Sequence, residues 1–363
     1  MATWGTAAMV TVVLLIGATA GCSMDPRDSV PEEPVVPRLG KVGMVVSLPG
    51  DPADYTTELA ADTYETVKRA GVRVSHLYYT WGQVEERRGV LRWDQADWAF
   101  AMTKAHGMEA SAEIKLIDVN HVGDLPADVT LSSFGDPALV ERFTAFCMAL
   151  CDRYAGTLRY LWIGNEIDLY LHERREQIGA YADLLGAVRA AVKEKHPGIA
   201  VGTVSTYHAA LENNALDVIR TVGARGDLIA FSLYPQMIAG AGPSDIADHF
   251  DAMAGIARAL GKRWAIVETG WSTEGIGGSE ALQTECVAEL FRAYGAHLDD
   301  MEFLGLFVLH DLPESANRQI AEMYGLGAYD EFLKFQGTLG LVKNDGTPKP
   351  AWGELLEQMR GLR

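Results

Sequence analysis

From residue 41 onward, short apolar or β-branched runs alternate regularly with longer amphipathic segments. Short apolar runs bounded by turn residues are typical of buried parallel strands, whereas the longer segments have the period of surface helices. The pattern predicts strands at 42–48, 72–79, 108–116, 158–166, 200–206, 228–234, 264–268 and 303–309. It predicts helices at 57–70, 94–106, 137–154, 177–196, 215–222, 244–260, 280–297 and 352–359.

Strict alternation of strands and helices in this number is typical of the (β/α)8 TIM barrel, an α/β fold. A doubly wound sheet would more often show a glycine-rich first turn, but no GxGxxG or Walker A sequence follows any predicted strand. The chain has 363 residues, of which 48% are hydrophobic, enough for one large core. We therefore expect a single barrel domain over residues 41–363.

The first 40 residues differ from the rest and predict export. An apolar stretch at 7–20 is short for a membrane span, and it leads into the sequence TAGC ending at Cys22, which resembles the lipobox of bacterial lipoproteins. Residues 1–22 are thus predicted to be a signal peptide, with Cys22 lipidated. The proline-rich, charged stretch at 23–40 predicts an extended tether.

This N-terminus predicts a membrane-anchored lipoprotein of the cell envelope. Because no Lys or Arg precedes Arg27, a cleaved secretory peptide or a misplaced start codon is the alternative. In the secretory case the protein would be secreted or periplasmic.

The charge balance narrows the class of partner. Asp and Glu number 49 against 31 Lys and Arg, a formal net charge of −18. Such a field repels nucleic acid and anionic polymers, so a neutral substrate is expected.

The cysteines and histidines predict no metal and no cofactor. Cys147 and Cys151 are one helical turn apart, a spacing that suits neither a relaxed disulfide nor, without histidine partners, a zinc site. We expect buried free thiols there and at Cys286. No HxH or HExxH spacing occurs among the nine histidines.

Polar and aromatic residues gather at the predicted carboxyl ends of the strands, where barrels of this kind carry their functional groups. The candidates for substrate contact are His76, Trp81, Lys115, Asn165, His208, Tyr234, Trp271 and His310. The histidines and the lysine could equally be hydrogen-bonded wall residues. The tryptophans could pack over the barrel mouth, although aromatic faces also stack on sugars.

Two apolar runs end abruptly on a glutamate: WIGNE at Glu166 and AIVE at Glu268. A carboxylate at the tip of a buried strand is costly unless it is used. The two strands are the fourth and seventh, which lie nearly opposite in a barrel, so the carboxyls can face each other. A separation of about 5 to 5.5 Å would permit the double displacement of a retaining glycosidase.

The sequences GNE at 164–166 and VETGW at 267–271 resemble the strand 4 and strand 7 signatures of clan A glycoside hydrolases. The resemblance implies that Glu166 is the acid/base, that Glu268 is the nucleophile and that Asn165 hydrogen-bonds the sugar 2-hydroxyl. The sequence SLYP at 232–235 resembles a strand 6 motif of endo-β-1,4-galactanases and endo-β-1,3-glucanases, and ETGW is most similar to the latter. We expect the Tyr234 hydroxyl within hydrogen-bond reach of Glu268.

Other stretches resemble different families of the same clan. The sequence YTWGQVE at 79–85 is similar to the strand 2 region of clan A β-galactosidases. Two positions depart from the common pattern: His76 stands where many members have an arginine that supports the nucleophile, and FVLHD at 307–311 lacks the tryptophan that often ends strand 8. The resemblance implies the clan but not the family or the substrate.

Three functions remain open on the sequence. The first is a retaining glycoside hydrolase that cleaves a neutral β-linked polysaccharide or oligosaccharide, and the second is a catalytically inactive, surface-anchored carbohydrate-binding barrel. A phosphate-handling barrel is disfavoured by the export signal and because the glycine-rich loop at 275–278 has no basic residue close by. We expect the loops at 120–136 and 312–344 to form the walls of the cleft.

Overall fold

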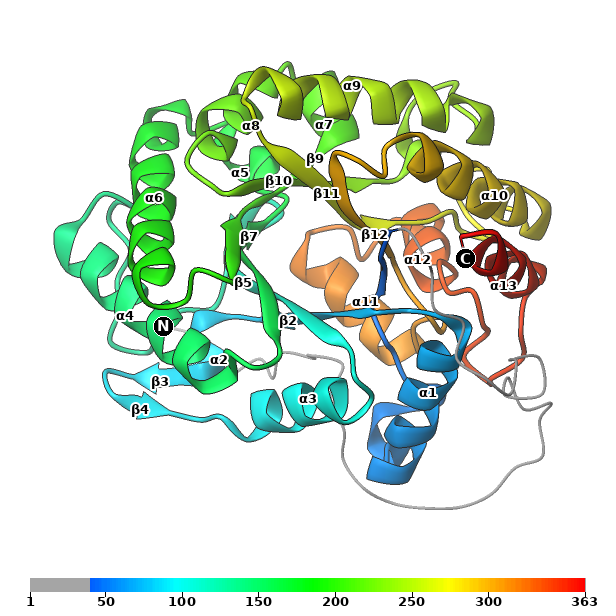
Figure 1. Cartoon of the computed structure of the whole chain (residues 1–363), viewed down its shortest axis with the longest axis horizontal. Helices are drawn as coiled ribbons and strands as arrows, with labels where there is room; N and C mark the ends of the chain where they lie inside the picture. Colours follow the sequence, from blue (N-terminus) through cyan, green and yellow to red (C-terminus); the bar gives the residue numbers. More distant parts are fainter. Residues whose placement is uncertain (1–39, 363) are drawn as a thin grey trace.

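The computed structural model describes residues 40–362, so Cys22, the signal peptide and the tether up to residue 39 lie outside the described residues. Within this range a sheet of parallel strands is surrounded by a ring of helices (Figure 1). The parallel strands are β1 (Val42–Met44), β2 (Val74–Tyr79), β5 (Glu109–Asp118), β7 (Leu158–Asn165), β8 (Ala200–Gly202), β9 (Val204–Thr206), β10 (Leu228–Leu233), β11 (Arg263–Thr269) and β12 (Met301–Leu306). The surrounding helices are α1 (Thr57–Ala70), α3 (Asp94–Ala105), α4 (Pro137–Tyr154), α6 (Ile178–Lys195), α8 (Leu216–Gly223), α9 (Ile246–Ala259), α10 (Glu280–Ala296) and α13 (Pro350–Gly361).

The sheet runs in the order β8-β7-β5-β2-β1-β12-β11-β10-β9. Its two ends, β8 and β9, are halves of one strand separated by Thr203, so the chain itself completes the ring. Thr203 contacts both neighbouring strands: its hydroxyl donates to the Ile163 carbonyl at 2.7 Å, and its carbonyl accepts from the Ala230 amide at 3.3 Å. The predicted (β/α)8 barrel is confirmed for the described residues.

The helices begin and end at residues suited to those positions. The Thr56 side chain caps the start of α1 by accepting from the Leu59 amide, and Gly71 ends that helix in the left-handed region at φ 107°. Asp136 caps α4, where Pro137 occupies the first turn, and Ser279 caps α10.

The interior of the barrel is filled by side chains from alternate strand positions. Tyr160 and Trp162 on β7 stack with ring centroids 6.0 Å apart, and Phe303 of β12 lies 4.9 Å from Tyr160. Gly202 is required beside them, because a Cβ there would lie 2.7 Å from the Trp162 ring. This packed floor closes the barrel below the carboxyl ends of the strands, so a cavity can open only above it.

Several short helices and strands lie in the loops at the carboxyl ends of the barrel strands. They are α2 (Trp81–Val84), a hairpin of β3 (Glu85–Arg87) and β4 (Val90–Leu91), β6 (His121–Val122), α5 (Asp168–Leu171) and α7 (Tyr207–Glu212). The predicted long loop at 312–344 contains two helices, α11 (Glu314–Met323) and α12 (Asp330–Gly337), drawn in orange inside the ring of outer helices in Figure 1.

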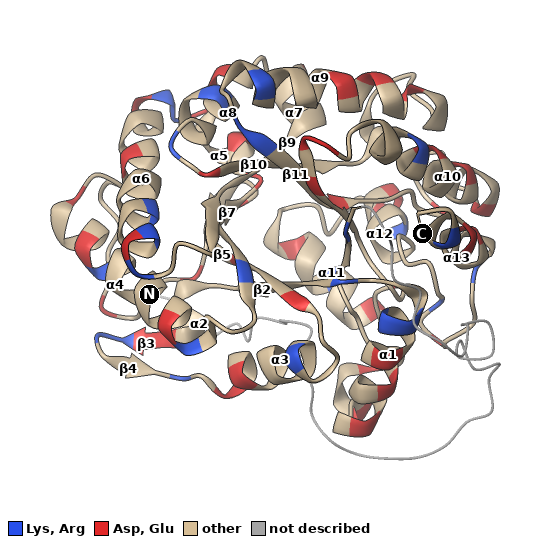
Figure 2. Ribbon diagram, viewed as in Figure 1, with Lys and Arg blue, Asp and Glu red and all other residues tan. Residues whose placement is uncertain are grey.

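Charges of both signs are spread over the outer helices (Figure 2). Cys147, Cys151 and Cys286 are buried free thiols, as predicted. Among the helices within residues 40–362, none is both long and apolar enough to cross a membrane.

Candidate active site

Glu166 follows the last residue of β7, at the carboxyl end of the barrel. The chain turns sharply there: Gly164 has φ 82° and Glu166 has φ 48°, an uncommon conformation for a residue with a side chain. A Cβ at position 164 would collide with Tyr181 and Ile167, so only glycine fits. The turn directs the Glu166 carboxyl into the cavity above the floor, where the Ser232 hydroxyl donates to its Oε1.

Glu268 lies on β11 and is held by two tyrosines. The Tyr78 hydroxyl donates to Oε1 at 2.6 Å, and the Tyr234 hydroxyl donates to Oε2 at 2.9 Å. The contact predicted between Tyr234 and Glu268 is confirmed, whereas the shorter bond from Tyr78 was not expected. Both carboxylate oxygens therefore have a donor, which stabilises the ionised form and fixes its orientation.

The two carboxyls share one cavity but differ in electrostatic surroundings. Burial, followed by the charge of Glu268, raises the pKa of Glu166 to about 8. Burial also raises the pKa of Glu268, but the hydrogen bond from Tyr78, the charge of Lys115 and the hydrogen bond from Tyr234 all oppose that rise. Glu166 is thus the group that keeps its proton at neutral pH, and Glu268 is the better stabilised carboxylate.

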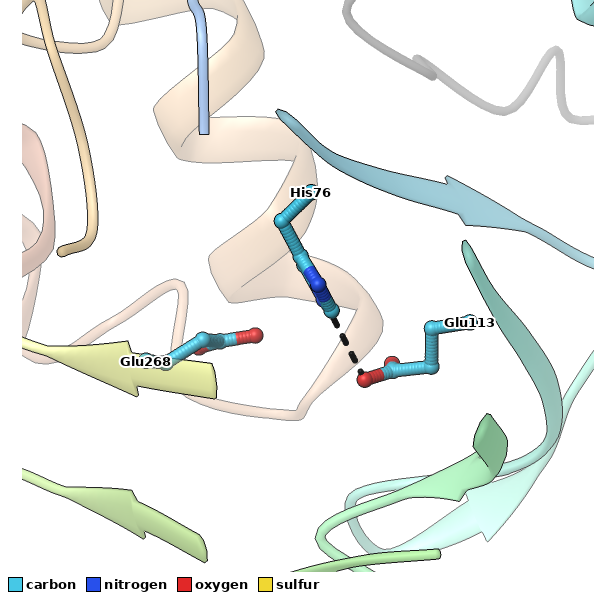
Figure 3. Close-up of side chains that lie close together, drawn as sticks. All are labelled: His76, Glu113 and Glu268. Carbon is cyan, nitrogen blue, oxygen red and sulfur yellow. Dashed lines mark ion pairs between the residues drawn. The ribbon is translucent and has the colours of Figure 1, made fainter. Parts of the chain in front are cut away.

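His76 and Glu113 lie close to Glu268, and the three side chains point toward one another (Figure 3). His76 Nε2 is 3.5 Å from Glu113 Oε2, and its Nδ1 is 2.9 Å from the Ser111 hydroxyl. Glu113 is fully buried, and neither of its oxygens has a hydrogen-bond partner. Burial therefore raises its pKa well above the ordinary value, which favours the neutral acid.

The same three residues are the group that could hold a metal ion among the described residues. One ligand atom from each of His76, Glu113 and Glu268 lies within 4.8 Å of the others. Burial and the charge of Lys115 lower the pKa of His76 to about 3, so its imidazole is neutral. Both oxygens of Glu268 are already hydrogen-bonded, so a bound ion would compete with the tyrosines for that carboxylate.

A second polar network lies on the β5 side of the cavity around Asp118. This buried carboxylate is 3.2 Å from Lys115 Nζ, accepts from Asn165 Nδ2 at 3.2 Å and accepts from the Tyr324 hydroxyl at 3.3 Å. Lys115 Nζ also lies 4.8 Å from the centre of the Tyr78 ring. His76 stands where an arginine is common, and the positive charge that acts on Glu268 comes from Lys115 on β5, the strand next to β2 in the sheet.

These groups line a cavity of about 550 Å³. Seven of the residues predicted from the sequence meet in it: Glu166, Glu268, Asn165, Tyr234, His76, Lys115 and His208. His208 Nδ1 is buried without a partner, and burial lowers the pKa of this histidine to about 4.

Three other predicted substrate-binding residues do not line the cavity. Trp81 is fully buried and donates its Nε1 to Glu85 at 2.7 Å. Trp271 is only 4% exposed, and the buried His310 ring contacts the Ser47 carbonyl at 2.7 Å. Their positions correspond to the alternative interpretation, packing and wall residues, and give no support to substrate contact.

Tyr78, Glu113, Asp118 and Tyr324 were not among the site residues predicted from the sequence. The sequence contained an indication for two of them. Tyr78 lies two residues after His76 on one strand, and Glu113 lies two residues from both Ser111 and Lys115 on another. Alternate strand residues share a face, so a polar residue in this register points into the barrel. Tyr324 carried no such signal, because it lies in the connection after the last strand.

Comparison with known proteins identifies the fold. Neither a protein-family model nor a curated protein sequence matches the chain. A GH5_18 glycoside hydrolase from Bifidobacterium longum subsp. infantis has a TM-score of 0.68 at 15% identity, over 89% of this chain and 79% of its own. A GH5_18 variant from Streptomyces cattleya, in complex with Manβ1-4GlcNAc, has a TM-score of 0.67 at 17% identity, over 89% and 81%.

An exo-β-1,4-mannosidase from Opitutaceae bacterium strain TAV5 has a TM-score of 0.67 at 13% identity, over 92% of this chain and 61% of its own. These neighbours are glycoside hydrolases of clan A, and the chain has their (β/α)8 fold.

Proposed function

We propose that this protein is a retaining glycoside hydrolase that acts on a neutral β-linked carbohydrate. The observation that carries the proposal is the pair Glu166 and Glu268, two buried carboxyls in one cavity whose hydrogen-bond partners and pKa shifts suit an acid and a nucleophile. The fold shared with glycoside hydrolases supports it. The sequence-based expectation of a polysaccharide or oligosaccharide substrate defines the first compounds to test.

The reaction has two steps. A Glu268 oxygen attacks the anomeric carbon while Glu166 transfers its proton to the glycosidic oxygen, so the leaving alcohol departs and a glycosyl ester remains. Glu166 then takes a proton from a water that attacks the same carbon, and Glu268 is released. Two displacements at one carbon retain its configuration.

The neighbouring groups have defined parts in this scheme. Tyr78 and Tyr234 would orient Glu268 for attack, and Asn165, which Asp118 positions, would bind a sugar hydroxyl. The raised pKa of Glu166 falls once Glu268 is esterified and loses its charge, so the same carboxyl can act as base in the second step.

The test is turnover of 4-nitrophenyl β-glycosides and of β-1,3-glucan, β-1,4-galactan, mannan and xylan by the full chain. We expect Glu268→Gln to abolish release of nitrophenol and of reducing sugar. Glu58→Gln, at an exposed position on α1, is the matched control and should behave as wild type. Sugar binding without turnover by the wild-type protein would instead establish the inactive carbohydrate-binding barrel.

A further inference from the structure

We propose that the substrate carries an apolar leaving group, an alkyl or aryl aglycone, beside the sugar that Glu268 attacks. The inference rests on the proposed function and deepens it by naming the substrate class. In place of the polysaccharide or oligosaccharide expected from the sequence, it names a small neutral glycoside with a hydrophobic aglycone.

An apolar wall begins directly at the nucleophile. The Tyr234 ring, whose hydroxyl donates to Glu268, meets the Phe335 ring edge-on at 5.7 Å and the Phe307 ring edge-on at 6.4 Å. Leu339, Met237 and Phe332 pack into the same cluster, and all of these residues line the cavity. A group attached to the reacting sugar on this side would extend away from the carboxylates and lie in apolar surroundings.

The connection between β12 and α13 extends this wall. From α11, α12 and the segment joining them, Ile320, Met323, Leu326 and Phe332 face the cavity and are only partly buried. Leu48 and Trp98 line it from the N-terminal part of the barrel. Partly buried apolar side chains at a cavity gain stability when a ligand removes them from water.

A second sugar would fit this wall poorly. Aromatic rings can stack on a sugar face, but leucine, isoleucine and methionine side chains offer neither a ring nor a hydrogen bond. Sugar hydroxyls placed against them would lose water without gaining a partner. The polar side chains that α11 and α12 add to the lining, within the described residues, are few: Gln319 and Gln336, with Tyr324 just beyond α11.

The division of the cavity matches a substrate with two unlike ends. The carboxyls of Glu166 and Glu268 and the network of Asp118, Lys115 and Asn165 form the polar part, where a sugar finds hydrogen bonds. The apolar wall lines another part of the cavity, and Gln83, Gln95, Asn120, Glu212 and Asn213 also line it. The volume of about 550 Å³ lies within the range that encloses a drug-sized ligand, which suits one sugar with a compact aglycone.

The experiment compares methyl and hexyl β-glycosides of the sugar whose 4-nitrophenyl glycoside is cleaved fastest by the full chain. Their leaving alcohols are similar in acidity, so a difference in kcat/KM reports contact with the added methylenes. We expect hexyl to exceed methyl by about tenfold or more, because each buried methylene is worth roughly three- to fourfold. The kcat/KM for the corresponding disaccharide should be lower than that for the hexyl glycoside.

Met323→Gln should reduce the ratio of kcat/KM for the hexyl glycoside to kcat/KM for the methyl glycoside several-fold. If this variant does not fold, Ile320→Gln takes its place. Glu322→Gln, exposed on the same helix, is the control and should keep the wild-type ratio. Equal kcat/KM for the two alkyl glycosides, or a faster disaccharide, would overturn the inference while leaving the proposed function intact. Absence of turnover with every glycoside would remove both.

Discussion

The Tyr78 hydroxyl on β2 donates a 2.6 Å hydrogen bond to Oε1 of Glu268 on β11, two strands that are separated by β1 and β12 in the sheet. With Tyr234 on the other oxygen, this bond holds the carboxylate from both sides. The Glu268 carboxylate is therefore oriented by side chains from opposite walls of the cavity, and each wall can be tested separately.

Tyr78→Phe should lower kcat/KM by about 10- to 100-fold, because a hydrogen bond to a charged group contributes roughly 1.5 to 3 kcal/mol. Removing the donor destabilises the Glu268 carboxylate and raises its pKa, so the acid limb of the pH profile should move to higher pH. Tyr234→Phe should also lower kcat/KM and move the acid limb to higher pH. Tyr160→Phe, in the packed floor, is the control, and an unchanged acid limb in Tyr78→Phe would refute the assignment.

Glu166→Ala should leave substrates with good leaving groups able to form the glycosyl ester, because such groups need no proton. Hydrolysis of that ester should then be slow, and azide should restore turnover by replacing the water that requires a base. The products are resolved by NMR: the wild-type sugar and the glycosyl azide should both keep the substrate's anomeric configuration. Inversion by the wild-type protein would exclude double displacement.

The pH profile should have an alkaline limb set by Glu166. Its pKa is raised to about 8 by burial and by the charge of Glu268, and only the protonated form can act as the acid. We expect kcat/KM to decline as pH rises through about 8, measured on a substrate with a poor leaving group. A highly activated aryl glycoside should show a weaker decline, because it does not need the proton.

Glu113→Gln should stabilise the fold at neutral and alkaline pH. The native pKa of Glu113 lies well above its unfolded value, so folding takes up a proton and stability falls as pH rises between those two values. The amide removes this dependence, and the gain in unfolding free energy should grow from pH 5 to pH 8. Glu109→Gln on the same strand, which pairs with Lys41, should show no such growth in urea denaturation.

Cys22→Ser should move the full chain from the membrane fraction of a bacterial host to a soluble fraction, if Cys22 carries the lipid anchor. Ser29→Ala, in the predicted tether, should leave the partitioning unchanged. Membrane association that persists in Cys22→Ser would argue against the lipoprotein and in favour of ordinary secretion.

Local sequence pattern was sufficient for the order of elements and for the two glutamates that share the cavity. Strand and helix periodicity is a property of consecutive residues, so the alternation could be read directly, although β1 ends at Met44 instead of residue 48 and strand 5 is divided at Thr203. Glu166 and Glu268 stood out because a charged residue that ends an apolar run has no other evident use.

The same reasoning could not separate the site from its surroundings. Trp81, Trp271 and His310 lie at strand ends as His76 and Lys115 do, but the first three point into packed regions. The direction of a side chain beyond a strand end depends on the turn that follows and on the helix packed against it, and neither is encoded in strand periodicity.

The sequence by itself determined a (β/α)8 barrel with a glutamate at each of two strand ends, because these features depend on neighbouring residues. Only the tertiary structure decided that Tyr78 and Tyr234 bind one carboxylate, that Glu113 lies buried beside His76, and that α11 and α12 add an apolar wall. These contacts join residues far apart in the chain, and strand register and closure of the ring determine which of them meet.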